Sequence, residues 1–341
     1  MAPRDNARAG DLLLSLLFLI GLPLLLAFLF EPVVKYTDRN SSRHHVVGLN
    51  YYADGRLCVH DCVVRGRAEK VDVSVVIPAF NEEKRLPVML ASAIPFLQEW
   101  SEREKTAFEV VVADDHSTDG TAKYVQELSK TNPKIRLLTL SENCGKGGAV
   151  RRGVQYARGQ YILMADADGA TEMADFEKLW ESLRSIEKSI DLGDGDSRRD
   201  ESRLGIALGS RAHLEQHSVA TRSWIRTVLM RGFHVLVMLL ATRKIRDTQC
   251  GFKLFTRKTA RLLFSNLHLE GWSFDIEIIY LAESLGIPLS ETSVRWHEVE
   301  GSKLIQSKFD VVLTSLKMAR DMVCLRLAYL FGIWKFNRKI S

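Results

Sequence analysis

The chain has 341 residues, of which 46% are hydrophobic and 26% charged. This composition excludes a disordered or fibrous protein and allows a full-sized hydrophobic core. The net charge of +5 is concentrated in residues 301–341, where eight basic residues face two aspartates, so the rest of the chain is close to neutral. A general nucleic-acid-binding protein is basic over a wider surface, and we therefore expect no nucleic-acid partner. The 5 cysteines are scattered and odd in number, which argues against a disulfide framework.

Residues 12–30 read LLLSLLFLIGLPLLLAFLF and carry no charge. As a helix this run would be about 28 Å long, close to the thickness of a bilayer core. A cleaved signal peptide has a shorter apolar region and small residues before its cleavage site, whereas this run ends in Phe28-Leu29-Phe30-Glu31. We expect a transmembrane anchor over 12–30, an N-terminal tail over 1–11 and, because periodicity is lost, a linker over 31–70.

Residues 71–300 alternate short apolar runs with helical patterns, as one α/β domain does. The pattern predicts strands over 73–77, 109–113, 135–140 and 161–165, and helices over 82–100, 121–130 and 147–157. This alternation is typical of a Rossmann-like fold with a largely parallel sheet. Open sheets of this kind bind ligands at the carboxyl ends of their strands.

Two basic amphipathic stretches follow, over 222–241 and 309–334. The first places Arg222, Arg226 and Arg231 among large apolar residues. Such helices can lie in the membrane interface, or can pack on the core as ordinary amphipathic helices, and the sequence leaves both readings open. We expect 222–241 to belong to the α/β domain and 301–341 to form a basic, membrane-associated segment.

Asp166-Ala167-Asp168 follows the apolar run YILMA and precedes Gly169. Two carboxylates at the end of a strand can turn towards one hard cation, and Mg²⁺ or Mn²⁺ would share such oxygen ligands with a diphosphate. The alternative is a solvated turn, because a D-x-D sequence is common.

Asp114-Asp115 ends an earlier strand, and Glu82 follows another. Acidic side chains would thus gather at one edge of the sheet, where one could accept the imide N–H of uracil while Glu82 contacts the base or ribose. The alternatives are local: Thr118 or Asp119 caps the next helix, and Glu82 is a carboxylate at a helix N-terminus.

Asn143-Cys144-Gly145-Lys146-Gly147-Gly148 is rich in glycine and precedes a predicted helix. Its spacing matches neither a P-loop nor a dinucleotide-binding turn. Its backbone N–H groups and Lys146 could meet a nucleotide sugar, or the segment could simply be a tight turn at the entry to the helix.

Four segments in register now carry a resemblance: VSVVIPAFNEE, VVVADDHSTDGT, NCGKGGAVRRG and ILMADADGA. In this order they resemble the family 2 inverting glycosyltransferases of the GT-A fold. LGSRAHL, IRDTQCGFKLFTR, GWSFDIE and EGSKL are similar to the branch that glycosylates dolichyl phosphate. The resemblance covers residues 73 to about 335. His116 departs from it, since the family more often has Gly there, and we expect an altered loop.

The resemblance implies roles for individual residues. The nucleotide-sugar site would be lined by Pro78, Ala79, Glu82, Asp114, Asp115, Lys146, Asp166 and Gln249. The catalytic group would comprise Asp166, Asp168, Arg211, Asp275 and Glu277, with Asp168 the firmer metal ligand and Asp166 the second. The acceptor phosphate would meet Arg211, Lys253, Ser302 and Lys303. An alternative for Arg211 and Asp275 is a buried ion pair with each other.

The resemblance also implies an activity: transfer of glucose from UDP-glucose to dolichyl phosphate with inversion, for protein N-glycosylation, with Mg²⁺ or Mn²⁺. The acceptor phosphate is already ionised near neutral pH, so no general base is needed. We expect a single-pass protein of the endoplasmic reticulum membrane with its catalytic domain facing the cytosol. The sequence leaves open a homo-oligomer.

Three alternatives remain: two other enzymes and a protein without catalytic activity. The sister mannosyl enzyme would use GDP-mannose. A processive polysaccharide synthase would need several membrane spans and a Q-x-x-R-W motif, and neither is present in the sequence. A non-catalytic membrane protein could retain the fold, although it would have no need for the acidic pairs and Lys146.

Overall fold

The computed structural model describes residues 22–41, 46–53, 56–60, 71–193, 204–214, 232, 235–242, 244–299 and 308–337. The N-terminal half of the predicted anchor, the tail 1–11, most of 222–241, and Ser302 and Lys303 lie outside these residues. The helices are α2 (Leu22–Ser41), α3 (Leu86–Glu104), α4 (Thr121–Thr131), α5 (Gly145–Tyr156), α6 (Phe176–Gly193), α9 (Arg257–Asn266), α10 (Phe274–Ser284) and α11 (Lys308–Leu330), with short 3₁₀ turns η2 (Met173–Asp175) and η4 (Ala212–Leu214). The strands are β1 (Val46–Ala53), β2 (Arg56–His60), β3 (Val73–Ala79), β4 (Phe108–Asp114), β5 (Ile135–Leu140), β6 (Tyr161–Met164), β7 (Ile206–Ser210), β8 (Lys253–Thr256) and β9 (Leu289–Ser293).

In the described part of the chain the strands form one mixed sheet in the order β2-β1-β5-β4-β3-β6-β8-β7-β9. The four central strands are parallel, as the sequence predicts, and β8 is antiparallel to both of its neighbours. The register pairs Ala79 with Asp114 and Val76 with Met164. The loops after β3, β4 and β6 therefore leave the sheet at one edge. Because β7 is parallel to β6 through β8, the loop after β7 leaves at the same edge.

The prediction of a linker over 31–70 is wrong for the hairpin formed by β1 and β2. These strands pair antiparallel, and β1 also pairs with β5, so the hairpin extends the sheet. The run VVGLNYYA of β1 is rich in β-branched and aromatic residues, and Asp54-Gly55 between the strands is a frequent sequence for two-residue hairpin loops. The five residues of β2, RLCVH, place three apolar residues in a row and so show no alternation of apolar and polar side chains.

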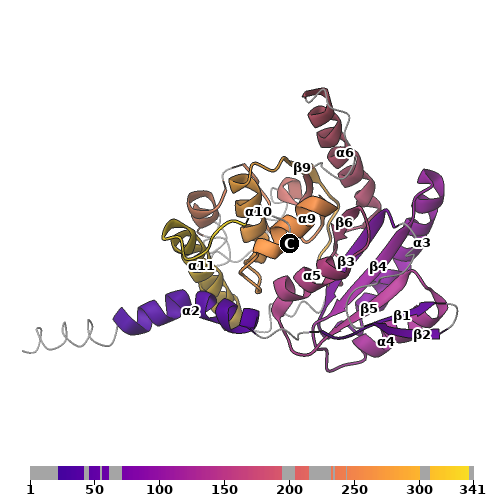
Figure 1. Ribbon diagram of the computed structural model, residues 1–341, viewed down its shortest axis with the longest axis horizontal. Helices are drawn as coiled ribbons and strands as arrows, with labels where there is room; N and C mark the ends of the chain where they lie inside the picture. Colours follow the sequence, from indigo (N-terminus) through magenta and orange to yellow (C-terminus); the bar gives the residue numbers. More distant parts are fainter. Residues whose placement is uncertain are drawn as a thin grey trace, which may run out of the picture.

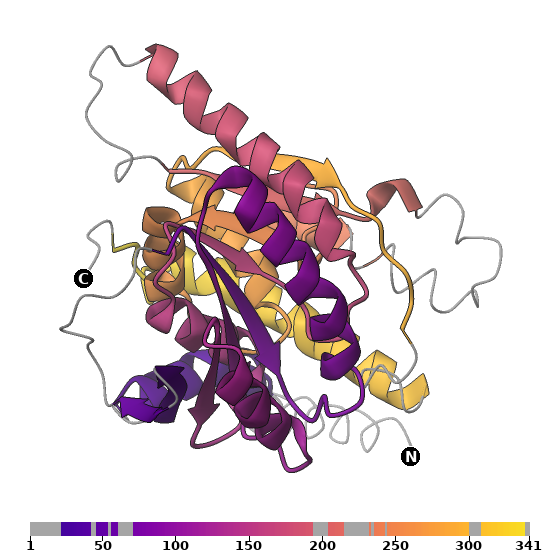
Figure 2. The ribbon, with the colours of Figure 1, turned by 90° about the vertical axis from the view of Figure 1, so that its right-hand side faces the viewer.

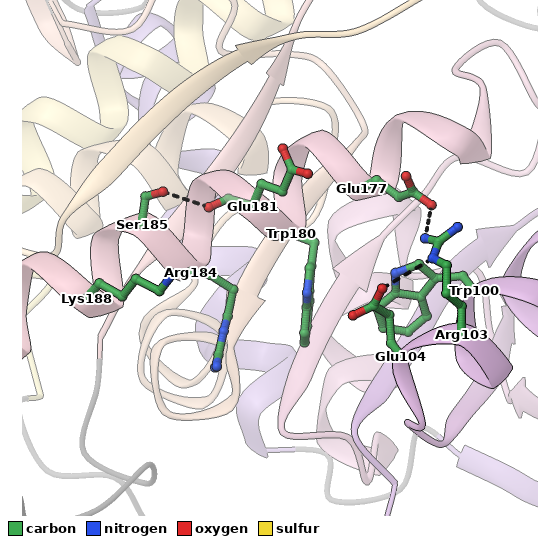
Figure 3. Close-up of a pocket in the computed structure, with 9 residues that line it drawn as sticks. All are labelled: Trp100, Arg103, Glu104, Glu177, Trp180, Glu181, Arg184, Ser185 and Lys188. Atoms are coloured by element: carbon green, nitrogen blue, oxygen red, sulfur yellow. Dashed lines mark hydrogen bonds and ion pairs between the residues drawn. The ribbon is translucent and has the colours of Figure 1, made fainter.

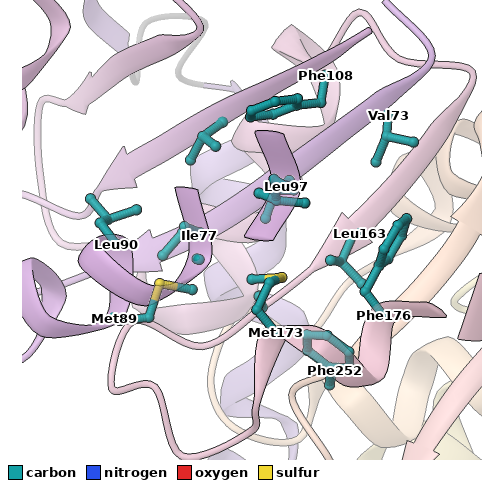
Figure 4. Close-up of a cluster of buried hydrophobic side chains, with 14 of the residues drawn as sticks. Val73, Ile77, Met89, Leu90, Leu97, Phe108, Leu163, Met173, Phe176 and Phe252 are labelled. Atoms are coloured by element: carbon teal, nitrogen blue, oxygen red, sulfur yellow. The ribbon is translucent and has the colours of Figure 1, made fainter. Parts of the chain in front are cut away.

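Helices cover both faces of the sheet, because alternate residues of its central strands point to opposite sides. Val75 and Ile77 face a core shared with α3, α4 and α6, whereas Val76 faces a core shared with α5, α9 and α10. Figure 2 shows α3 and α6 lying side by side across the first face, where the ring of Trp100 meets Phe176 edge-on at 4.8 Å. Figure 4 shows the first core, into which strands and helices send interlocking aliphatic and aromatic side chains.

The first and last helices of the described chain, α2 and α11, contact each other on the side away from α3 and α4 (Figure 1). Arg320 of α11 forms an ion pair with Glu31 of α2 and stacks over Phe28 with its guanidinium carbon 5.0 Å from the ring centre. α2 continues to Ser41, beyond the predicted end of the anchor. None of the helices in the described ranges has both the length and the apolar character needed to cross a bilayer.

The C-terminal segment is partly an ordinary packed helix. Met322, Cys324 and Leu325 of α11 are buried in the cores around α10, which supports the packed alternative for this part of 309–334. The same helix leaves Val312 and Leu316 exposed. The structure thus gives α11 one face packed on protein and one apolar face on the surface.

Glu109 anchors a polar cluster at the other edge of the sheet. Its carboxylate, 0% exposed, accepts hydrogen bonds from the hydroxyl of Ser74 at 2.6 Å, from Arg136 at 2.8 Å, and from the backbone and side chain of Arg158 at 2.7 Å each. Burial alone would raise the pKa of Glu109, but Arg136 and Arg158 outweigh it and lower the pKa below 4.5. The cluster ties β3, β4 and β5 to the loop before β6.

We expect Glu109→Ala to lower the free energy of unfolding by about 3–5 kcal/mol, because it strands the buried guanidinium of Arg136. The carboxylate has a depressed pKa in the fold, so its contribution is complete above the pKa of the unfolded chain and is lost as pH falls through the folded value. The free energies of unfolding of wild type and Glu109→Gln, measured with denaturant, should therefore differ most near neutral pH and converge in acid. A pH-independent difference would contradict the charge pairing.

Candidate active site

The loops after β3 and β4 are locked together by hydrogen bonds. The N–H of Asp115 donates to the carbonyl of Ala79 at 2.8 Å, and the N–H of Asn81 donates to the hydroxyl of Ser117 at 2.8 Å. The N–H of Glu82 donates to the hydroxyl of Thr121 at 2.7 Å. Pro78 and Ala79, which end β3, and the residues that follow them thus form one surface with the acidic turn after β4, as the sequence predicts.

His116 adopts a positive φ of 62°, the left-handed region that glycine populates freely. His adopts this conformation here, which Asn, Asp and His do more readily than most residues. The expectation that His116 alters the loop relative to Gly stays a prediction. Histidine is exposed here, so its side chain meets no steric obstacle from the core.

Asp115 holds the start of α5. Its two carboxylate oxygens accept the N–H groups of Cys144 at 2.7 Å and Gly145 at 2.8 Å, and the N–H of Gly147 donates to the carbonyl of Glu270 at 2.8 Å. These three N–H groups are satisfied within the protein, so the expectation that the backbone of the loop meets a nucleotide sugar is not supported for them. The contact of Asp115 with uracil stays a prediction, and the residue is buried, with 2% of its surface exposed.

Asp114 lies one residue earlier and is enclosed. It is 1% exposed, and burial raises the pKa of its carboxyl above 3.8 despite hydrogen bonds from Ser117. Its position at the end of β4 agrees with the sequence. The structure does not bring its carboxylate to the surface formed by the two loops.

Asp166 lies at the centre of the edge, with its side chain 35% exposed. The ammonium of Lys146 lies 2.6 Å from Asp166 Oδ1. Gly251 presses against the same carboxylate, because a Cβ at that position would overlap with it. The sequence predicts both Lys146 and Asp166, whereas it gives no reason to expect that Gly251 is required here for close approach.

Charge keeps this pair ionised. Burial alone would raise the pKa of Asp166, but Lys146, followed by Lys253 and Arg211, outweighs it and lowers the pKa below 3.8. Burial likewise opposes the charge of Lys146, but Asp166 and then Asp275 raise its pKa above 10.5. An ammonium and a carboxylate therefore face each other at neutral pH.

Asp168 is the second member of the D-x-D pair, and it has no cation as close to it as Lys146 is to Asp166. Its side chain is 30% exposed, one oxygen accepts the N–H of Ala170 at 3.0 Å, and the other lies 4.0 Å from Arg85. Arg85 in turn holds Glu82 through two hydrogen bonds of 2.5 and 2.7 Å. Glu82, Arg85 and Asp168 form a chain of alternating charge, which places the acidic loops after β3 and β6 side by side.

Asp166 and Asp168 suit a divalent ion that arrives with a diphosphate. No cluster of three or more His, Cys, Asp or Glu side chains poised for a metal occurs among the described residues. Mg²⁺ and Mn²⁺ bound with nucleotides need only one or two protein carboxylates, and phosphate and water complete their coordination. The donor set is thus that of a metal shared with substrate and not of a closed protein cage.

Two ion pairs, one buried and one partly exposed, complete the site. Lys253, 0% exposed, donates to Asp275 and to the carbonyl of Cys250 at 2.5 Å each. Arg211 donates to Asp247 from its backbone and side chain at 2.7–2.9 Å. The alternative in which Arg211 pairs with Asp275 is therefore wrong, since each has another partner. The predicted direct contact of Lys253 with the acceptor phosphate is not supported, because its ammonium is fully enclosed.

Asp247 is the residue that the sequence interpretation missed. It lies in the quoted run IRDTQCGFKLFTR, two positions before the predicted Gln249, whose N–H it accepts at 3.2 Å. Glu291 fixes this turn by accepting the N–H of Asp247 at 2.9 Å. The available signal was an aspartate between basic residues, but its pairing with Arg211 spans 36 residues and cannot be read from local pattern.

Glu277 is not brought to the site. Its carboxylate accepts the N–H groups of His268 and Leu269 at 3.0 and 2.6 Å and meets the ring nitrogen of His268 at 2.9 Å. Glu277 is buried, and its partner His268 stacks on the buried ring of Trp334 and meets the half-buried ring of Tyr329 edge-on. These contacts assign Glu277 to the packing of α10 on the C-terminal segment.

Two exposed tryptophans flank the charges. Trp272 lies below Lys146, with 5.4 Å between the ammonium and its ring centre, and Trp296 lies 5.7 Å from the guanidinium carbon of Arg211. Large aromatic rings at the surface commonly mark binding sites. Their location beside the two basic residues confines the site to the edge that carries Asp166.

A separate pocket of about 420 Å³ lies between the C-terminal part of α3 and α6 (Figure 3). Because α3 runs back from the end of β3, this pocket is at the edge of the sheet opposite to Asp166. Its charges neutralise one another, with Arg103 bound to both Glu104 and Glu177. It contains none of the predicted site residues.

The chain was compared with known proteins. Residues 74–263 match the family model of glycosyl transferase family 2. A dolichyl-phosphate beta-glucosyltransferase of Dictyostelium discoideum is 48% identical over 79% of this chain and 78% of the relative, and that of Homo sapiens is 46% identical over 78% of each. A solved structure, glucosyl-3-phosphoglycerate synthase of Mycobacterium tuberculosis with UDP, aligns with a TM-score of 0.44 at 17% identity, over 74% of this chain and 80% of that one.

The match extends over more than half of the chain and includes every strand from β3 to β8. It agrees with a mixed sheet whose parallel strands end in an acidic edge, which is the GT-A type of α/β fold. The chain belongs to glycosyl transferase family 2, within the dolichyl-phosphate beta-glucosyltransferases.

Proposed function

We propose that this protein transfers glucose from UDP-glucose to dolichyl phosphate with inversion, giving dolichyl β-D-glucosyl phosphate for protein N-glycosylation. The observation that carries the proposal is the juxtaposition of Asp166 with Lys146, and of Asp168 with the Glu82–Arg85 pair, at one sheet edge. This edge can hold a nucleotide diphosphate and its counter-ions together. The 46–48% identity with named glucosyltransferases supports the sugar and the acceptor.

On the donor side the loops after β3 and β4 would hold uridine. Their interlocked hydrogen bonds give a rigid surface before the nucleotide arrives, so little ordering is needed on binding. Glu82 is held by Arg85 and can accept from the ribose or base without being free to swing. Lys146 supplies a point charge for the diphosphate.

The residues fit Mg²⁺ or Mn²⁺, with Asp168 the firmer ligand and Asp166 the second. When bound, the ion would neutralise charge that develops on the departing UDP. Asp168 is suited to this role because only one of its oxygens is engaged at hydrogen-bond distance in the contacts described above. Asp166 Oδ1 meets the ammonium of Lys146, which the ion would either displace or share the carboxylate with.

On the acceptor side Arg211 is the cation best placed for a phosphate. It is fixed by Asp247 and neighbours Trp296, and it interacts electrostatically with Asp166. A dolichyl phosphate is itself the nucleophile, so the protein has to align it behind C1 of glucose and screen the repulsion of two anions. No general base is required for this step.

Membrane attachment is part of the proposal. Leu24, Leu25 and Phe28 of α2 and Leu313 and Leu316 of α11 are exposed apolar side chains on the two paired helices. This surface, the uncharged run 12–30 and the basic residues of 301–341 together suit a lipid-bound enzyme. We propose a single-pass location in the endoplasmic reticulum membrane with the catalytic domain in the cytosol, where UDP-sugars are made.

The direct test is transfer of radiolabel from a panel of UDP- and GDP-sugars to dolichyl phosphate by the purified 341-residue chain. We expect labelled lipid from UDP-glucose, with a β anomeric linkage by NMR. Transfer from GDP-mannose instead would support the mannosyl enzyme. No transfer from any donor would support a non-catalytic protein and overturn the proposal.

We expect Asp168→Asn to lower kcat by about 100-fold or more, because it removes a charge that the divalent ion needs. Glu127→Gln is the matched control, since it removes one acidic charge from an exposed pair with Lys130 on α4. Initial rates over a range of Mg²⁺ and Mn²⁺ concentrations would measure the effect. Unchanged rates for Asp168→Asn, or full activity in excess chelator, would exclude the metal role.

We expect Asp247→Asn to lower kcat/KM for dolichyl phosphate by about 30-fold or more, because Arg211 loses its charged partner. The KM for UDP-glucose should stay nearly constant. If Asp247 acts through Arg211, the double variant Arg211→Ala, Asp247→Asn should be no worse than Arg211→Ala alone. Additive losses in this cycle would show that Asp247 has a separate role.

A further inference from the structure

Lys146 occupies the position of a counter-ion in the ligand-free protein. Its ammonium lies 2.6 Å from Asp166 Oδ1, and no other partner of that enclosed oxygen is found among the described residues. The contact is therefore a single ion pair between two side chains. An ion pair of this kind can be exchanged for another cation without breaking a shared network.

The backbone that carries Lys146 is fixed. The preceding Gly145 donates to Asp115 at 2.8 Å, and the following Gly147 donates to the carbonyl of Glu270 at 2.8 Å. A Cβ on Gly147 would also overlap with Phe274, which shows how closely α5 is seated. Only the side-chain torsions of Lys146 can carry its ammonium away from Asp166.

A divalent ion on Asp166 and an ammonium on the same carboxylate would repel each other. Two like charges about 4 Å apart interact unfavourably by several kcal/mol at the dielectric typical of a partly buried site. Without the nucleotide, the ion can bind only if it displaces Lys146 or if both cations share the carboxylate. A diphosphate changes this balance, because it gives the displaced ammonium an anionic partner.

We propose that Lys146 is a built-in competitor of the divalent ion at Asp166, and that the diphosphate of the donor relieves this competition by taking Lys146 as its own partner. Lys146 thus couples metal binding to nucleotide binding, and the metal-free, nucleotide-free site stays neutralised. The inference rests on the proposed function, whose donor supplies the diphosphate.

The change in the affinity for metal alone, when the charge of Lys146 is removed, distinguishes a competitor from a residue that only binds phosphate. If Lys146 only bound phosphate, its removal would leave the affinity for metal alone unchanged. If Lys146 only supported the fold, its removal would weaken the binding of metal. A competitor, in contrast, makes the site bind metal alone more tightly when it is removed.

The test is a titration of the purified full-length chain with Mn²⁺, followed by the EPR signal of free Mn²⁺, without and with UDP. Mn²⁺ held by UDP in buffer is subtracted. The variants are Lys146→Met, which removes the charge, and Lys146→Arg, which keeps it. Lys134→Met is the matched control, because Lys134 loses the same charge at the opposite edge of the sheet, where it lies over Phe108.

We expect Lys146→Met to bind Mn²⁺ alone about tenfold more tightly than wild type, and UDP to enhance that binding about tenfold less. Lys146→Arg and Lys134→Met should behave as wild type without UDP. If thermal unfolding shows that Lys146→Met does not fold, Lys146→Gln replaces it with the same expectation.

Unchanged or weaker binding of Mn²⁺ alone by the folded, uncharged variant would overturn the competition, while UDP-dependent binding by wild type would leave the proposed function intact. No binding of Mn²⁺ by wild type, even with UDP, would overturn both the metal role and the competition. The two failures are therefore distinguished by the wild-type titration.

Discussion

The carboxylate of Asp115 is the contact on which the geometry of the site depends. It accepts the first N–H groups of α5, while the backbone N–H of Asp115 donates to the end of β3. An anionic side chain at a helix N-terminus is stabilising both as a hydrogen-bond acceptor and through the helix dipole. Because Lys146 is the next residue along α5, the capping contact also fixes where its ammonium can reach. One aspartate at the end of β4 thereby aligns the nucleotide-binding edge with the cation that neutralises Asp166.

Around this contact, charges of opposite sign are paired in the absence of substrate. Lys146 meets Asp166, Lys253 meets Asp275, and Arg211 meets Asp247. Partly buried ions are tolerated only when they are paired, and pairs of this kind cost more in desolvation than they return unless their geometry is good. A site built from such pairs can admit a metal, a diphosphate and a phosphate by exchanging partners. The protein then changes its internal pairing without leaving a charge uncompensated.

The sequence predicted the parallel centre of the sheet because alternating strands and helices have distinct periods, and it placed Asp166 and Asp168 correctly because strand ends share an edge. It did not reveal the partners of Arg211 and Asp275. Each pairing depends on a residue more than twenty positions away, and any nearby acid or base fits the local pattern equally well. The hairpin of β1 and β2 was missed for a related reason: its inner strand, β1, pairs with β5, and no local period reports that pairing.

Lys253 shows how a residue can serve the site without touching a ligand. It begins β8 opposite Met164, two residues before Asp166, and is wholly enclosed. From there its charge lowers the pKa of Asp166 and also that of Asp247, the partner of Arg211. In a region of low dielectric such an interaction extends further than it would in water. The buried ammonium of Lys253 thus favours the ionised form of Asp166 on the donor side. It also favours the ionised form of Asp247, which holds Arg211 on the acceptor side, so both halves of the site stay charged for binding.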